Sequence, residues 1–155
     1  MMTKYEKSVK HIATVRGYMM QAVGNLQDRL LHHDDSKLVE PERSAYEGLD
    51  EALRGIAFGS DEYSQIIKTH LGPALQHHYD HNDHHIEHHY GEGIKGMSLF
   101  SLLEMLADLR AVCDEKGKPV IDLEVNQKIH GFGDELFQIL LNTIDELGWK
   151  DEVQS

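Results

Sequence analysis

The first residues in the chain that suggest a metal site are the adjacent His33 and Asp34. Both side chains can reach one ion where the backbone turns between them, because imidazole suits transition metals and a carboxylate can bridge two ions. The polar string continues through Asp35 and Ser36 to Lys37, whose ammonium group could bind a phosphate oxygen. The same string would also suit the start of a helix capped by Asp34, Asp35 or Ser36. Taken alone, the string leaves both interpretations open.

Histidine is unusually frequent, with twelve residues in the chain and seven of them between His77 and His89. An expression tag would be terminal and contiguous, whereas this cluster is internal and interrupted. On a helix that continues the preceding apolar face, His78 and His85 would occupy core-facing positions with Asn82 between them. A core histidine needs a polar partner or a metal, so we predict these two as ligands. A solvated loop that binds metal loosely is the alternative.

Two carboxylates, Glu104 and Asp108, are four residues apart and share one face of a predicted helix over about 98–112. Leucine and methionine side chains surround them, and an unpaired carboxylate buried there would be costly. In one interpretation both are solvated, with Arg110 nearby. In the other they point at a cation.

A further histidine, His11, lies beside the apolar Ile12, and a hydrogen-bonded boundary histidine is the simplest interpretation. In one straight helix His11 and His33 would lie roughly 33 Å apart, too far to share an ion. If both are ligands, the chain must reverse between them. Gly24-Asn25 is the only obvious place for such a break.

Helical patterns separated by glycine and proline cover the chain, and no strand pattern is convincing. The first helix carries an apolar stripe at three- and four-residue steps: Tyr5, Val9, Ile12, Met19, Val23, Leu26 and Leu30. We expect helices over about 4–31, 41–54, 60–91 with a kink or interruption at Gly72-Pro73, 98–112, a short stretch to 130, and 134–147. The fold class is therefore all-α, a single domain over 1–155 with five to seven helices, in which the motifs span about 10–112 and C-terminal helices span about 120–148.

The bulk composition excludes several classes of protein. The net charge of -12 argues against binding along a nucleic-acid backbone, although bound cations would allow a small phosphate ligand. No apolar run approaches the ~20 residues of a membrane span, and the first ten residues lack an apolar signal stretch. The lone Cys113 excludes an internal disulfide, which favours a reduced, cytoplasmic compartment.

The ordered set of His11, His33-Asp34, the histidine cluster and Asp108 resembles the HD superfamily of metal-dependent phosphohydrolases. The phrasing from His78 to His88, followed by Glu104 to Asp108, is similar to a small uncharacterised branch seen largely in phage and bacterial genomes. This chain has Ile86 where that branch commonly has proline. The resemblance implies an HD-type helical bundle with a primary metal set of His11, His33, Asp34 and Asp108. It also implies His78 and His85 as ligands of a second ion, with His84 competing with His85.

The expected function is hydrolysis of a small phosphorylated substrate, a nucleotide by resemblance, with one or two divalent transition metals (Mn, Fe, Co, Ni or Zn). Asp34 would bridge ions or orient water, and Lys37 would bind phosphate. Glu87 or Glu104 would act as general base or orient a ligand histidine, and Asn82 and His84 would contact substrate. An HD-type di-iron oxygenase and a non-enzymatic metal-binding or interaction protein are the alternatives. The oligomeric state is left open.

Overall fold

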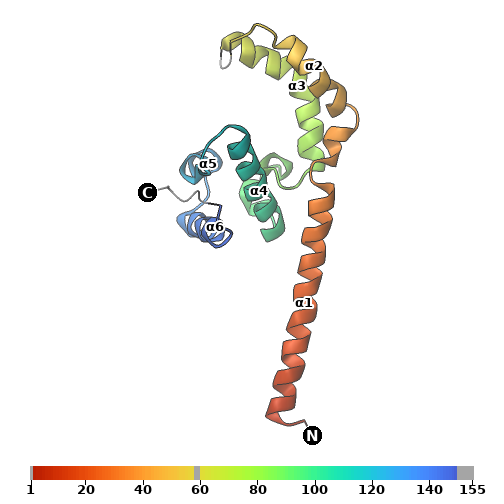
Figure 1. Ribbon diagram of the computed structural model, residues 1–155, viewed down its shortest axis with the longest axis vertical. Coiled ribbons are helices and arrows are strands. Elements are labelled where there is room, and N and C mark those ends of the chain that lie inside the picture. Colours follow the sequence, from red (N-terminus) through yellow and green to blue (C-terminus); the bar gives the residue numbers. More distant parts are fainter. Residues whose placement is uncertain (1, 58–59, 150–155) are drawn as a thin grey trace. The chain divides into compact units, whose positions relative to one another are not determined.

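The computed structural model describes residues 2–57 and 60–149, and all regular structure in these two ranges is helical (Figure 1). The all-α prediction is confirmed, and six α-helices lie in the described ranges, within the expected five to seven. The elements are α1 (Lys4–His32), η1 (Asp35–Leu38), α2 (Glu42–Ala52), α3 (Asp61–His81), η2 (Ile86–His88), η3 (Gly93–Gly96), α4 (Leu99–Glu115), α5 (Leu123–His130) and α6 (Asp134–Glu146), where η marks a 3₁₀ helix.

Contacts along the chain define two compact units, Met1–His33 and Asp34–Ser155, and each is described by itself. The expected single domain over 1–155 stays a prediction. None of the helices in the described ranges combines the length and apolar character that crossing a bilayer would require.

The first unit consists of α1, which begins with a capping box. The Thr3 hydroxyl accepts a hydrogen bond from the Glu6 amide at 3.2 Å, and the Glu6 carboxylate accepts one from the Thr3 amide at 2.7 Å. From there the helix runs for 29 residues without interruption.

The predicted break at Gly24-Asn25 is therefore wrong. A glycine within a helix costs only about 1 kcal/mol relative to alanine, which a long helix tolerates. An unbroken helix separates His11 from His33 by roughly 33 Å. The two histidines cannot bind the same ion, so the primary metal set that included both needs correction.

The second unit has its apolar core between α4, α5 and α6. One face of α4 supplies Leu102, Leu106 and Cys113, and the other helices and their connections complete the core with Ile121, Leu123, Phe132, Leu140 and Ile144. Gly131 and Gly148 follow α5 and α6 in left-handed conformation, as expected for glycines that end helices. This core holds α4 rigidly and leaves its opposite face for the polar residues described below.

Helix α3 begins where the sequence predicts, because the Ser60 hydroxyl accepts a hydrogen bond from the Tyr63 amide at 3.1 Å. It continues through Pro73, where a kink or interruption was expected, and its two halves run in different directions in Figure 1. It then ends at His81, so the prediction of helix up to residue 91 is wrong. The Asn82 side-chain amide donates to the His78 carbonyl at 2.7 Å, replacing the backbone amide that would have continued the helix.

Candidate metal centre

The turn that follows α1 positions the carboxylate of Asp34. Its backbone is left-handed, with φ 58° and ψ 22°, a conformation that Asp tolerates better than most residues. The Asp34 carbonyl accepts a hydrogen bond from the Lys37 amide at 2.9 Å, which starts η1. The Lys37 ammonium contacts Asp34 Oδ2 at 2.6 Å, whereas Oδ1 is closed off from solvent. The predicted helix cap is thus a 3₁₀ turn that directs one carboxylate oxygen inward.

Three histidine rings converge on the buried Asp34 oxygen. The Nε2 atoms of His78 and His84 lie 3.5 Å and 3.4 Å from Oδ1. The Nε2 atom of His85 lies 2.8 Å from that of His78. All four residues offer a ligand atom within 4.8 Å of the others, and we call them the ligand cluster. His78 and His85 meet because the chain folds back after α3, not because they share a helix face.

Two further carboxylates contact the outer nitrogens of these rings. Glu42 Oε2 lies 2.9 Å from His78 Nδ1, and Glu104 Oε1 lies 3.3 Å from His84 Nδ1. A carboxylate accepts hydrogen bonds, so these contacts favour the tautomers with a proton on Nδ1. The Nε2 lone pairs of both rings then face Asp34 Oδ1. This is the carboxylate–histidine arrangement that orients ligand histidines at metal sites.

Glu42 is the residue that sequence reasoning missed. It opens α2 after Pro41, where an acidic residue is ordinary, so nothing in the sequence distinguishes it. In the structure its side chain is fully buried, and its second oxygen lies 2.7 Å from His77 Nδ1. Burial by itself raises the pKa of Glu42, but hydrogen bonds with His77 and Ser36 and the charge of His78 lower it overall. Glu42 is therefore a buried anion that anchors α3 on α2.

Asn82 has a structural role, and the substrate contact expected of it stays a prediction. Its amide donates to the Ser36 hydroxyl and to the His78 carbonyl, each at 2.7 Å. Both amide protons are then engaged, and the side chain is buried. Asn82 connects η1 to the end of α3 and fixes His78 between them.

Helix α4 presents its polar face to the same place. The Ser101 hydroxyl donates to Asp83 Oδ2 at 3.1 Å, and Glu104 meets His84 as described. An Asp108 oxygen lies within 4.8 Å of an Asp34 oxygen. The resemblance implied this approach of Asp108 to Asp34, and neither Glu104 nor Asp108 is on a fully solvated face.

The pKa shifts near the cluster concern one of its histidines and the lysine beside Asp34. Burial, followed by the neighbouring His84 and His78, lowers the pKa of His85 to about 3, so its ring is neutral at physiological pH. Burial alone lowers the pKa of Lys37, but its hydrogen bond to Asp34 and the charge of Asp34 raise it overall. Neutral imidazoles and an ionised carboxylate are the forms that bind metal.

The separations within the ligand cluster fit a single ion. Ligand atoms about 2.0–2.1 Å from a tetrahedral ion lie about 3.4 Å from one another. The Asp34–His78 and Asp34–His84 separations, 3.5 Å and 3.4 Å, match that value. The closer pair of His78 and His85, at 2.8 Å, would need to separate by about 0.6 Å to reach that value. The donor set of one oxygen and three nitrogens suits zinc, manganese, cobalt, nickel or iron.

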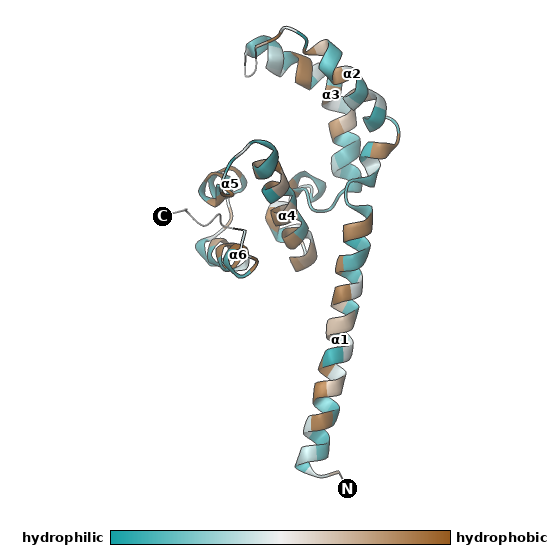
Figure 2. Ribbon diagram, in the orientation of Figure 1, coloured by the Kyte–Doolittle hydropathy of each residue, from teal (hydrophilic) through white to brown (hydrophobic). Residues whose placement is uncertain are grey.

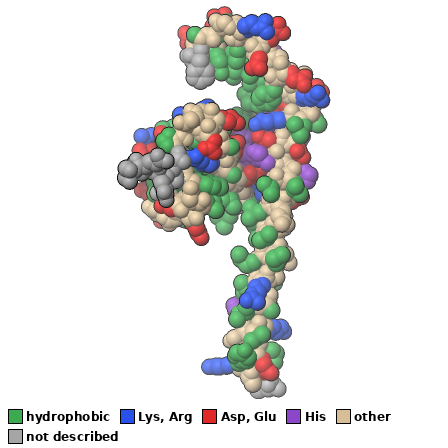
Figure 3. Space-filling view, viewed as in Figure 1, with side chains coloured by type: hydrophobic (Ala, Val, Ile, Leu, Met, Phe, Trp, Pro, Cys, Tyr) green, Lys and Arg blue, Asp and Glu red, His purple; other side chains and the backbone are tan. Residues whose placement is uncertain are grey.

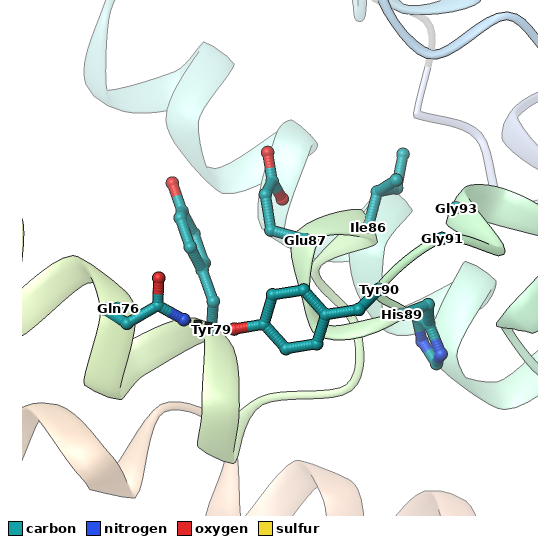
Figure 4. A pocket seen from close by; sticks show the side chains of 8 residues that line it. All are labelled: Gln76, Tyr79, Ile86, Glu87, His89, Tyr90, Gly91 and Gly93. Carbon is teal, nitrogen blue, oxygen red and sulfur yellow. Dashed lines mark hydrogen bonds between the residues drawn. The ribbon is translucent and has the colours of Figure 1, made fainter.

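One cavity adjoins the cluster, and a second, larger cavity shares lining residues with the first. The smaller, about 180 Å³, is lined by His84, His85 and Asp108 among others, and the larger is about 540 Å³. Tyr79, Ile86 and Glu87 line both. In Figure 4 the side chains of Tyr79, Ile86 and Glu87 extend to the same side, and the Tyr90 ring lies across the larger cavity.

Apart from His77, which contacts Glu42, the remaining histidines of the region bond to backbone and lie outside the cluster. His81, His88 and His89 contact the carbonyl oxygens of His77, Tyr79 and Asp83 at 2.7, 2.8 and 2.9 Å. Both His84 and His85 belong to the cluster, so both lie where a metal ligand could stand. His33 belongs to the first unit, and its role as a ligand stays a prediction.

Comparison with known proteins gives one match. No curated protein and no solved structure matches the chain. The sequence model described as a family of unknown function (DUF5662) matches residues 1–146. Because this match spans nearly the whole chain, the protein belongs to the DUF5662 family.

Proposed function

We propose that this protein is a divalent-metal-dependent phosphohydrolase that acts on a small phosphorylated substrate, a nucleotide. The observation that carries the proposal is the convergence of three histidine nitrogens on the buried oxygen of Asp34. With Nδ1 protonated, the Nε2 lone pairs of His78 and His84 face the Asp34 carboxylate, and a cation between them would offset their repulsion. The resemblance to the HD superfamily, without His11 in the site, points to the same chemistry.

A divalent ion held by Asp34, His78, His84 and His85 would polarise a phosphoryl oxygen and, by expanding to five ligands, lower the pKa of a water at the added position to about 7. Glu42 and Glu104 contact the outer nitrogens of His78 and His84 and would orient both rings toward the ion. Lys37 keeps its positive charge beside Asp34, and its ammonium group would also bind a phosphate oxygen of the substrate.

The general base is better assigned to Glu87 than to Glu104. Glu104 meets a ring nitrogen of His84, so its carboxylate serves to position that ligand. Glu87 lines both cavities and its side chain is exposed, so it can take a proton from water and release it to solvent.

The cavities support a substrate larger than phosphate. A volume of about 180 Å³ beside the ligand cluster can hold a phosphoryl group but lies below the roughly 300 Å³ at which cavities for drug-sized ligands begin. The adjoining 540 Å³ cavity offers the rings of Tyr79 and Tyr90 and the amide of Gln76. Aromatic rings stack on nucleobases, so a nucleoside would occupy this second cavity.

The test compares two adjacent carboxylates. Asp34→Asn removes the central ligand, whereas Asp35→Asn changes an exposed neighbour in the same turn. Purified wild type and Asp35→Asn should carry about one transition metal per ligand cluster and release phosphate from nucleotides in a panel with Mn, Co, Ni, Zn and Mg. Asp34→Asn should lose both metal and turnover.

Bound metal without phosphate release from any nucleotide or sugar phosphate would overturn the hydrolase assignment. Two irons with visible absorption on oxidation would favour the oxygenase instead. Equal metal content in Asp34→Asn and the wild type would overturn the metal centre itself.

A further inference from the structure

The longest helix of the protein, α1, leaves its apolar stripe uncovered in the unit to which it belongs. None of its 29 residues is buried. The exposed side chains include Tyr5, Val9, Ile12, Met19, Val23 and Leu30, and hydrophobic residues recur along the whole helix (Figures 2 and 3). An isolated amphipathic helix gains little stability from propensity alone and is normally stabilised by packing.

The stripe follows a seven-residue repeat. One position of the repeat, every seventh residue, holds Tyr5, Ile12, Met19 and Leu26, and the position four residues later holds Val9, Arg16, Val23 and Leu30. These alternating steps of four and three residues are the d and a positions of a coiled coil. A strict seven-residue repeat favours pairing with another helix of the same period.

The repeat is complementary to itself when two copies run in opposite directions. A two-fold axis between Gly17 and Tyr18 pairs every a position with a d position of the second copy. The resulting layers are Tyr5 with Leu30, Val9 with Leu26, Ile12 with Val23, and Arg16 with Met19, each formed twice. All eight a and d residues of each helix then lie in a layer.

Arg16, the one charged residue in the repeat, selects this orientation. In a parallel pair the two Arg16 side chains would occupy the same layer and repel each other. In the antiparallel pair each Arg16 faces Met19, along which its aliphatic stem can lie while the guanidinium reaches water. A polar residue at one a position is a common way to fix register and orientation.

We propose that α1 is the dimerisation element of this protein and pairs antiparallel with α1 of a second copy. The interface would extend along a helix of roughly 43 Å. This inference is independent of the metal chemistry, because it involves no residue of the ligand cluster.

Molar mass in solution gives the first test. Wild type should have twice the chain mass of 17.7 kDa. Ile12→Glu with Val23→Glu places charges on facing layers and should yield monomer. The control, Thr14→Glu with Gln21→Glu, adds the same charge to exposed positions on the outer face and should remain a dimer. A monomeric wild type would overturn the proposal, and a larger mass would exclude the two-helix pair.

Cysteine cross-linking tests the orientation, in a Cys113→Ala background. Val9→Cys with Leu26→Cys should form a covalent dimer on mild oxidation. The two positions lie roughly 25 Å apart within one helix, so they cannot link within a chain. Val9→Cys alone should not link, because position 9 meets its equivalent only in a parallel pair. Efficient linking of the single variant would contradict the antiparallel arrangement.

Discussion

His84 Nε2 lies 3.4 Å from Asp34 Oδ1, while the other ring nitrogen of His84 lies 3.3 Å from Glu104. The ring is thus held between a carboxylate on α4 and a carboxylate in the turn before η1, and its side chain is almost completely buried. This relationship joins three separate segments of the chain at one imidazole. Through this ring α4 lies near Asp34, as the resemblance implied.

Glu104, whose carboxylate contacts the outer nitrogen of His84, should tune metal affinity without being a ligand itself. Glu104→Gln removes the charge that holds the Nδ1 proton, and metal affinity should fall by roughly 10–100-fold. Glu115→Gln changes an exposed residue at the end of the same helix and should leave the affinity unchanged. Competition with a chelator measures both variants. An unchanged affinity in Glu104→Gln would show that His84 is not held in this way.

The histidines of the region should separate into two groups. His78→Ala and His85→Ala each remove a member of the ligand cluster and should abolish stoichiometric metal binding. His88→Ala and His89→Ala remove contacts to backbone carbonyls and should retain it. Metal analysis of the four purified variants distinguishes these outcomes. Equal losses in all four would indicate a loose chelating surface.

Glu42 should contribute strongly to stability. Glu42→Gln leaves two histidine nitrogens beside a buried amide in place of an anion, and the free energy of unfolding should fall by about 1–3 kcal/mol. Glu47→Gln, which removes an exposed contact with Arg43, should change it by less than about 0.5 kcal/mol. Denaturant titration of the metal-free proteins provides the comparison. Similar values for the two variants would show that the Glu42–histidine contacts are weak.

The contribution of Glu42 should also depend on pH. Its pKa is lower in the folded than in the unfolded protein, because the hydrogen bonds from His77 and Ser36 outweigh the effect of burial. The resulting stability is fully present above the unfolded pKa and is lost as the pH falls through the folded pKa. The difference in unfolding free energy between wild type and Glu42→Gln should therefore shrink as the pH falls below about 4.5, the ordinary pKa of a Glu carboxyl. A difference that stays constant as the pH falls would argue against a buried anion.

The sequence predicted the helices well because caps and periodicity are local signals. Ser60 and Gly131 mark helix ends that the structure reproduces. Asp34 and His78 stood out by residue type, since a carboxylate and a core-facing histidine both need partners. These features depend on residues within a few turns of each other.

Other features depend on tertiary contacts that local patterns do not encode. Helix α3 ends before His84 because Asn82 bonds back to His78, an event that periodicity cannot reveal. Glu42 has an ordinary position in the sequence, and only the packing of α2 on α3 buries it against two histidines. The break expected at Gly24-Asn25 was required only by a shared role for His11 and His33, and the local sequence was free to remain helical.

A crystal structure with anomalous diffraction, from protein saturated with Zn²⁺ or Mn²⁺, tests the central claim most directly. The account predicts one strong anomalous peak about 2.0–2.3 Å from Asp34 Oδ1 and from the Nε2 atoms of His78, His84 and His85. Glu42 and Glu104 should remain on the outer nitrogens of His78 and His84. An occupied metal elsewhere, with the histidine nitrogens bonded directly to Asp34, would contradict the account.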